Sequence, residues 1–136
     1  MKVGEIMQKD VVTATPNMSL AQVQRLMRDK RIRHIPVVSG KRLVGIVTDR
    51  DIRDASPSPA TTLSRGEINY QMDTTPIETC MSRVVITVHA DDDLVQAARL
   101  LLEHKYGCVP VVAGTQLMGI ITEIDCLQAF LASTSD

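Results

Sequence analysis

The chain repeats itself after 74 residues, and this internal repeat limits its possible folds more than any other feature. Residues 3–53 align with residues 77–127 without a gap, and sixteen of the 51 paired positions are identical. The clearest part reads "GIVTDRD" at 45–51 and "GIITEID" at 119–125, each preceded by a Pro-Val-Val run. Such self-similarity indicates two copies of one structural unit joined end to end.

Both copies predict the same order of elements. The β-branched runs "VVTAT" and "VVITV" predict a leading strand. A helix with one apolar face follows, and we expect Asn17 or Ser19 to cap it in the first copy and Asp91 in the second. Two strands around the turns "SGKR" and "AGTQ" come next, and then a second helix. Each copy is therefore a β-α-β-β-α unit, and the expected fold class is α+β.

The repeat also predicts the domain organisation. We place the first repeat at 3–53 and the second at 77–129, with a linker at 54–76 that begins rich in Pro and Ser. The linker also contains apolar residues, which are compatible with a short helix docked on the rest of the protein. Because a unit of about 50 residues buries little apolar surface by itself, we expect the two copies to share one core as a pseudo-symmetric module.

Composition excludes several functions. The net charge is −1 and aromatic residues make up 2%, so neither nucleic acid nor a membrane is an expected partner. We find no signal peptide and no apolar run of membrane-spanning length. Three cysteines without a CxxC pair argue against a disulfide framework or a metal site, which favours the cytoplasm. No catalytic motif is recognised, so we expect no catalytic residues and no enzyme activity.

The doubled "PVV…G…L(V/M)GI(V/I)T(D/E)xD" pattern resembles a tandem pair of CBS (cystathionine β-synthase) domains, the Bateman module, from Val3 to about Ala129. Within that family, "RHIPVV", "VTDRDI" and "ASPS" are most similar to the CBS pair of the bacterial acetoin-utilisation accessory protein. The resemblance implies a regulatory module that binds an adenosine-containing ligand such as AMP, ADP or ATP in clefts between the repeats. It also implies a homodimer, a disc of two CBS pairs, that signals to an unidentified effector protein. The alternative is a structural dimerisation module without a bound ligand.

The resemblance also implies the site residues. In each cleft the Asp of the Gly-apolar-x-Thr-x-x-Asp motif would bind ribose hydroxyls, with the Thr beside it. The residues just before the proline would line the base pocket. The matched positions are Thr48, Asp51 and Ile46 in the first motif, Thr122, Asp125 and Ile120 in the second, and Ile32, Arg33, His34, Tyr106, Gly107 and Cys108 before the prolines.

A helix start explains the same Thr and Asp without a ligand. A Thr followed three residues later by an acidic residue is a capping-box pattern, in which the two residues exchange hydrogen bonds. The usual box has Glu or Gln at the third position, and we expect Asp to be too short for the return bond. On that argument Asp in both copies favours ligand binding, although the two roles are compatible.

The copies differ in charge. Residues 3–53 carry ten Lys and Arg against five Asp and Glu, and residues 77–127 carry three against seven. The family pattern places Arg33 and His34 opposite Asp125, where both could bind phosphate. We therefore expect the Asp125 cleft to be the better phosphate site. The opposite charges also favour a head-to-tail dimer.

The three cysteines have different expected roles. Cys108 aligns with His34 at the pocket edge and is the candidate reactive thiol. Cys80 and Cys126 align with isoleucines and are expected to be buried as small hydrophobic side chains.

Overall fold

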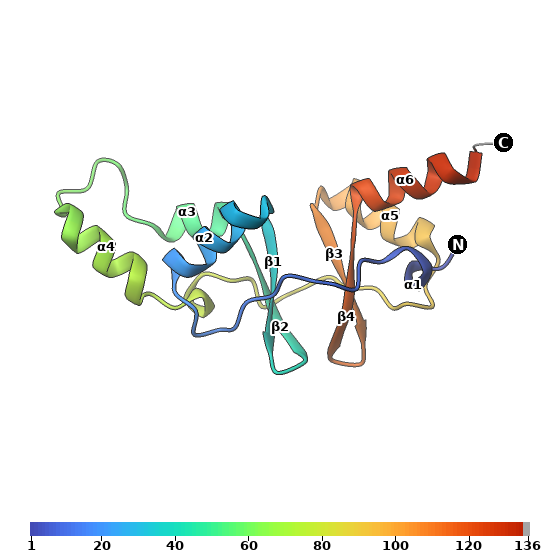
Figure 1. Ribbon diagram of the computed structural model, residues 1–136, viewed down its shortest axis with the longest axis horizontal. Coiled ribbons are helices and arrows are strands. Elements are labelled where there is room, and N and C mark those ends of the chain that lie inside the picture. Colours follow the sequence, from blue (N-terminus) through green and yellow to red (C-terminus); the bar gives the residue numbers. More distant parts are fainter. Residues whose placement is uncertain (135–136) are drawn as a thin grey trace. The chain divides into compact units, whose positions relative to one another are not determined.

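A computed structural model describes residues 1–134, which form two compact units (Figure 1). The first-repeat unit contains Val12–Gly40 and Val44–Val85. The second-repeat unit contains Met1–Val11, Lys41–Leu43 and Ile86–Asp136. Helices and antiparallel hairpins make up both units, so the fold class is α+β, as the sequence predicts.

The two repeats exchange their leading segments. The short helix α1 (Val3–Ile6) begins the first repeat, but it packs in the second-repeat unit, where the Val3 amide donates to the Asp92 carbonyl at 2.8 Å. The 3-10 helix η1 (Ile77–Thr79) begins the second repeat, but it packs in the first-repeat unit, where the Ile77 amide donates to the Met18 carbonyl at 2.7 Å. A repeat that is continuous in sequence is therefore divided between two units.

From its first long helix onward, the first-repeat unit follows the predicted order of elements, and specific residues cap that helix at both ends. Ser19 caps its first helix, because Ser19 Oγ accepts a hydrogen bond from the Gln22 amide at 3.1 Å and the Ser19 amide donates to Gln22 Oε1 at 2.9 Å. Arg31 ends that helix in the left-handed conformation at φ 56°. The elements of the first-repeat unit are α2 (Leu20–Lys30), β1 (His34–Ser39), β2 (Arg42–Thr48, in this unit from Val44 onward), α3 (Asp49–Ala55) and the linker helix α4 (Arg65–Thr74). Helix α4 packs against α2.

The second-repeat unit mirrors these features, with one correction to the predicted cap. The Asp92 carboxylate accepts from the His89 amide at 2.8 Å, so the chain is still turning there and the helix starts later. Asp93 rather than Asp91 is the N-cap, and Lys105 ends the helix at φ 55°. The elements are α5 (Leu94–His104), β3 (Cys108–Ala113), β4 (Gln116–Thr122) and α6 (Glu123–Thr134).

The predicted leading strands are reduced to single parallel bridges. Ala14 pairs with Val37, where the Ala14 amide donates to the Pro36 carbonyl at 3.0 Å and the Val38 amide donates back at 2.8 Å. The next bond of a parallel ladder toward Val12 would need an N–H at residue 36, which proline lacks. Val88 forms the equivalent bridge to Val111, beside Pro110.

Each unit has a core cluster of its own. Aliphatic side chains fill both clusters, because the chain contains almost no aromatic residues. The exchanged segments contribute a fully buried residue to each cluster. The first-repeat cluster contains Ala14, Leu20, Val23, Met27, Ile35, Val37, Val47, Ile52, Ile77 and Met81, and the second-repeat cluster contains Val3, Val88, Leu94, Ala97, Leu101, Val109, Val111, Ile121 and Ala129.

Candidate functional site

Both predicted Thr–Asp pairs lie where a strand ends and a helix begins, and both form a complete capping box. The Thr48 amide donates to Asp51 Oδ2 at 2.9 Å, and the Asp51 amide donates to Thr48 Oγ1 at 3.1 Å. The corresponding distances for Thr122 and Asp125 are 2.9 and 3.2 Å. The expectation that Asp is too short is wrong, since the extended backbone of Thr48 (φ −114°, ψ 163°) brings its amide within reach. Capping thus accounts for the Asp in each copy.

The two carboxylates differ in their further hydrogen bonds. Asp125 is 8% exposed, and its Oδ2 also accepts from Thr122 Oγ1 at 2.9 Å. Gln8 Nε2 donates to both carboxylate oxygens of Asp125, at 3.0 and 3.1 Å. Asp51 is half-buried, and within residues 1–134 the hydrogen bond to its carboxylate comes from the Thr48 amide alone. Its Oδ1 therefore keeps its capacity to accept a hydrogen bond.

The glycine of the second motif explains how Gln8 reaches Asp125. Gln8 and Ile120 exchange backbone hydrogen bonds of 2.9 and 3.0 Å, which holds the leading segment against β4. A Cβ atom at Gly119 would lie 2.6 Å from the Gln8 carbonyl oxygen, closer than any real contact. Gly119 is thus required for this close approach, and the approach leaves the predicted site residue Ile120 half-buried.

The first motif uses its glycine in the same way. Ile46 and Ser82 exchange backbone hydrogen bonds of 3.0 and 2.9 Å, and a Cβ atom at Gly45 would lie 2.8 Å from the Ser82 carbonyl oxygen. Ser82 is the residue that aligns with Gln8 in the repeat. Its hydroxyl donates to the Val84 carbonyl at 3.1 Å, within its own segment.

The predicted base-pocket residues of the first repeat lie between α2 and β1. Ile32 is half-buried against the first-repeat core. Arg33 is exposed, and its carbonyl accepts from the Asp49 amide at 3.0 Å, which ties the start of β1 to the start of α3. His34 is half-buried and begins β1. The structure therefore brings Arg33 close to the helix that Thr48 caps.

The corresponding residues of the second repeat are less polar. Tyr106 is exposed and stacks on His104, with ring centroids 5.3 Å apart. Gly107 is half-buried, and Cys108 is buried at the start of β3, directly opposite Thr122 in the β3–β4 register. The structure thus brings Cys108 beside Thr122.

Burial changes the expected chemistry of the cysteines. Cys108 is 6% exposed, and burial raises the pKa of its thiol to about 11. The expectation that Cys108 is a reactive thiol is therefore wrong, because the thiolate is the reactive form. Cys80 and Cys126 are half-buried rather than fully buried. Burial raises the pKa of both thiols. The negative charge of Asp51 raises the pKa of Cys80 further, and those of Asp125 and Glu123 do the same for Cys126.

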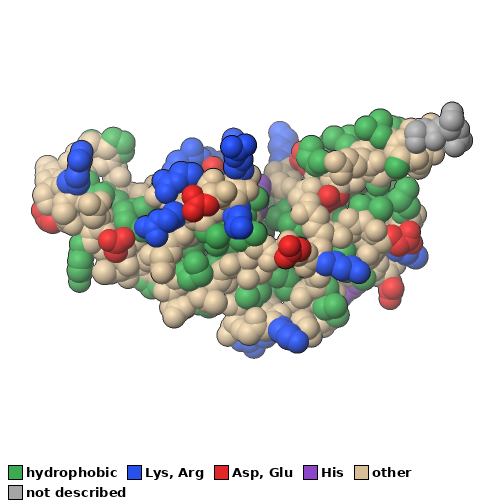
Figure 2. Space-filling model, in the orientation of Figure 1, with side chains coloured by type: hydrophobic (Ala, Val, Ile, Leu, Met, Phe, Trp, Pro, Cys, Tyr) green, Lys and Arg blue, Asp and Glu red, His purple; other side chains and the backbone are tan. Residues whose placement is uncertain are grey.

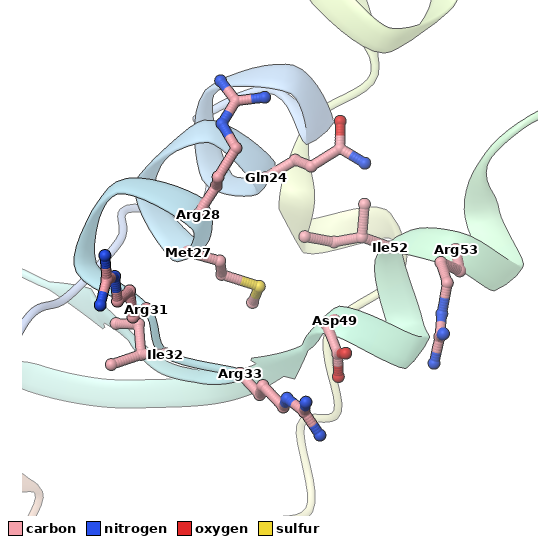
Figure 3. Close-up of a pocket in the computed structure, with 9 residues that line it drawn as sticks. All are labelled: Gln24, Met27, Arg28, Arg31, Ile32, Arg33, Asp49, Ile52 and Arg53. Carbon is pink, nitrogen blue, oxygen red and sulfur yellow. The ribbon is translucent and has the colours of Figure 1, made fainter.

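A pocket of about 420 Å³ opens in the first-repeat unit between α2 and α3 (Figure 3). Thr48 and Asp51 do not line it, because the α3 residues that do are on another face of the helix. Four arginines surround apolar side chains, and one carboxylate lies among them. The lining residues are Gln24, Met27, Arg28, Arg31, Ile32, Arg33, Asp49, Ile52 and Arg53.

Sequence patterns alone do not reveal two features of these sites. Gln8 lies outside the repeated motif, although the repeat alignment places it opposite Ser82, directly after a methionine shared by both copies. The arginines around the pocket are evident in the sequence only as an excess of charge in the first repeat. Figure 2 shows Lys and Arg side chains gathered over α2 and α3, so that this excess forms one basic surface.

Other kinds of site find no support in the part of the chain that the structure describes. Residues 1–134 contain no group of three or more His, Cys, Asp or Glu side chains arranged to hold a metal ion. Among the helices of the same residues, none is long and apolar enough to cross a membrane.

The duplicated units, each with a capped helix after an antiparallel hairpin, define a tandem α+β repeat module. The chain belongs to the CBS domain family, whose model matches residues 3–58 and 77–132. CBS domains are regulatory ligand-binding modules.

Comparison with individual proteins agrees with this assignment. The chain is 34% identical over 131 residues to MJ1404 of Methanocaldococcus jannaschii, covering 93% of this chain and 31% of that protein. It spans less than half the length of the first archaeal relatives that it matches.

Two solved structures share the fold along nearly the whole chain. A Vibrio cholerae protein assigned to acetoin utilisation, AcuB, is 30% identical, with a TM-score of 0.81 and coverage of 98% of this chain and 92% of that one. This similarity confirms the resemblance to an acetoin-utilisation CBS pair. CBSX2, a CBS-pair protein of Arabidopsis thaliana solved in complex with AMP, is 27% identical, with a TM-score of 0.81 and 98% coverage of both chains.

Proposed function

We propose that this chain is a regulatory module that binds an adenosine-containing nucleotide of the AMP, ADP or ATP class. The observation that carries the proposal is the half-buried carboxylate of Asp51. Its Oδ2 serves the helix cap, while its Oδ1 accepts no hydrogen bond from the described residues. A ribose supplies hydroxyl donors for such an oxygen, and a hydrogen bond to a charged acceptor is among the stronger ones in proteins.

Other residues predicted for the first-repeat site suit the remaining parts of a nucleotide. Ile32 and Ile46 are half-buried apolar side chains of the kind that packs on a base, and Arg33 offers a planar donor group for phosphate oxygens. Asp125 repeats the capped arrangement of Asp51 in the second-repeat unit. The complex of CBSX2 with AMP, in a fold with a TM-score of 0.81, supports the choice of an adenine nucleotide.

A thermal-shift panel of AMP, ADP, ATP, S-adenosylmethionine, NADH and cyclic di-AMP tests the proposal. A ligand present at a hundred times its dissociation constant adds about 2.7 kcal/mol to the free energy of unfolding, which gives a clear rise in Tm. Asp51→Asn is the matched variant, because the asparagine oxygen can still accept the capping bond from Thr48 while the charge is lost. We expect it to reduce the shift without lowering the Tm of the free protein by more than a few degrees.

The alternative function, a dimerisation module, has an observation of its own. Ile124, Leu127, Phe130 and Leu131 form one stripe along α6 and are each at least 57% exposed. Figure 2 shows this apolar surface over α6. Exposed apolar stripes of this kind mark interaction surfaces.

We therefore propose a homodimer that uses α6, in which ligand binding changes the arrangement that an effector protein recognises. Absence of any shift in the ligand panel, together with a stable dimer, would favour the purely structural role.

A further inference from the structure

We infer that Gln8 competes with the ligand for Asp125, so that Asp51 is the carboxylate that binds ribose first. This inference rests on the proposed nucleotide-binding function and assigns a specificity role to a residue outside the repeated motif. It also reverses the order expected from charge, which favoured the Asp125 cleft.

The hydrogen bonds around Asp125 leave little room for another donor. A carboxylate offers about four lone-pair positions. Thr122 supplies two donors to Oδ2, its amide and its hydroxyl, both at 2.9 Å. The Gln8 amide then spans both oxygens at 3.0 and 3.1 Å. A pair of ribose hydroxyls therefore has to displace Gln8 before it can bind this carboxylate.

The Gln8 backbone is fixed while its side chain is free to leave. The two backbone hydrogen bonds to Ile120 hold Gln8 beside β4. Gln8 is exposed, so its side-chain amide can form hydrogen bonds with water once it leaves Asp125. Displacing Gln8 therefore lowers the affinity of Asp125 for the ligand but does not prevent binding. Since a hydrogen bond to a charged group is lost, we expect the cost to be about tenfold or more in dissociation constant.

The first-repeat unit lacks this competitor. Ser82 occupies the equivalent position against Ile46, with the same pair of backbone hydrogen bonds. Its short side chain bonds instead to the carbonyl of Val84. Asp51 therefore keeps an oxygen available for a ligand hydroxyl. The two motifs have the same Thr and Asp residues, but their carboxylates differ in availability to a ligand. The difference comes from the residue beside each strand, which is Gln8 beside β4 and Ser82 beside β2.

Calorimetric titration with AMP tests the inference in variants that separate the two carboxylates. Asp51→Asn removes the stronger site, so the remaining binding reports on Asp125. In that background, Gln8→Met keeps the length of the side chain but cannot donate. We expect it to tighten the remaining AMP binding about tenfold. Gln8→Ser, which copies Ser82, should do the same and serves as the second variant if Gln8→Met folds poorly.

The reciprocal change, Ser82→Gln in the otherwise unaltered protein, should weaken the stronger AMP site by a similar factor.

Three results would contradict parts of this scheme. If both Gln8 substitutions in the Asp51→Asn background leave AMP binding unchanged or make it weaker, the role of Gln8 is overturned, although the proposed function would stand. Loss of all AMP binding in Asp125→Ala, with Asp51→Ala unaffected, overturns the assigned order. If the unaltered protein binds no nucleotide of the panel, the proposed function itself fails, and the inference fails with it.

NMR of the side-chain amide gives a readout that does not depend on affinity. In the Asp51→Asn protein, saturation with AMP should shift the Gln8 side-chain N–H resonances toward the values of a solvated amide. Resonances that stay unchanged while AMP binds would show that Gln8 keeps its bond to Asp125, which contradicts displacement.

Discussion

Gln8 and Asp125 are 117 positions apart in the sequence, yet the Gln8 side-chain amide lies 3.0 Å from Asp125 Oδ1. This contact joins the leading segment of the first repeat to the helix start of the second. It exists because residues 1–11 pack in the second-repeat unit. The same exchange places the backbone of Gln8 against Gly119, and mutation of that glycine tests the contact.

Gly119→Ala should destabilise the protein because its Cβ would meet the backbone of Gln8 at 2.6 Å. Crowding against a backbone atom costs about 1–3 kcal/mol in the free energy of unfolding, which urea denaturation measures. Gly66→Ala in α4 is the control, since outside the backbone of its own helix the atom nearest to a Cβ there is Ser64 Oγ, 3.9 Å away. That substitution should raise stability by about 0.5–1 kcal/mol. Equal effects of the two changes would contradict the close approach.

Thr122→Ala should cost more stability than Thr48→Ala. Each removes a helix cap, worth about 0.5–2 kcal/mol. Thr122 Oγ1 also donates to the buried Asp125 carboxylate at 2.9 Å, whereas Thr48 and Asp51 are joined only by the two bonds of the capping box. Thermal unfolding of both variants measures the difference, and Thr122→Ser, which keeps the hydroxyl, should retain most of the stability. A larger loss for Thr48→Ala would argue against the extra bond.

Stability should fall at alkaline pH in part because of Cys108. Its pKa rises from 9.0 to about 11 on burial, so the folded protein holds the thiol proton more tightly than the unfolded chain. This contribution is fully present below pH 9 and is lost as the pH rises through about 11, and it amounts to about 2–3 kcal/mol.

Denaturation between pH 8 and 11 measures this loss, and Cys108→Ala should flatten the curve in that range. Alkylation offers a second check. In the native protein at pH 8, Cys108 should react far more slowly than Cys80 or Cys126, and rapid labelling of Cys108 would show that it is not buried.

Leu127→Glu should weaken the proposed homodimer. Leu127 is 57% exposed near the middle of the α6 stripe, so a charge there should leave the fold of a single chain unchanged. Light scattering after size exclusion would report a shift toward the monomer. Tyr70→Glu on α4, at a residue 70% exposed, is the matched control and should leave the mass unchanged. A dimer that survives Leu127→Glu would place the interface elsewhere.

Much of the local structure followed from sequence spacing. The helix cap at Ser19, the glycine turns with positive φ at Gly40 and Gly114, and the Thr–Asp helix starts all depend on residues at most four positions apart. Interactions over so short a distance depend little on the rest of the chain. Pro36 shows the limit of this approach, because the β-branched run before it predicted a strand that the missing N–H shortens to one bridge.

The tertiary structure decided what lies beside each motif. The sequence by itself determined the repeat, the element order and the family resemblance, since periodicity and turn chemistry are properties of neighbouring residues. It did not determine that the leading segments change places, that Cys108 is buried opposite Thr122, or that Gln8 binds Asp125 while Ser82 leaves Asp51 available. These contacts join residues far apart in the chain, and close packing of whole segments selects them.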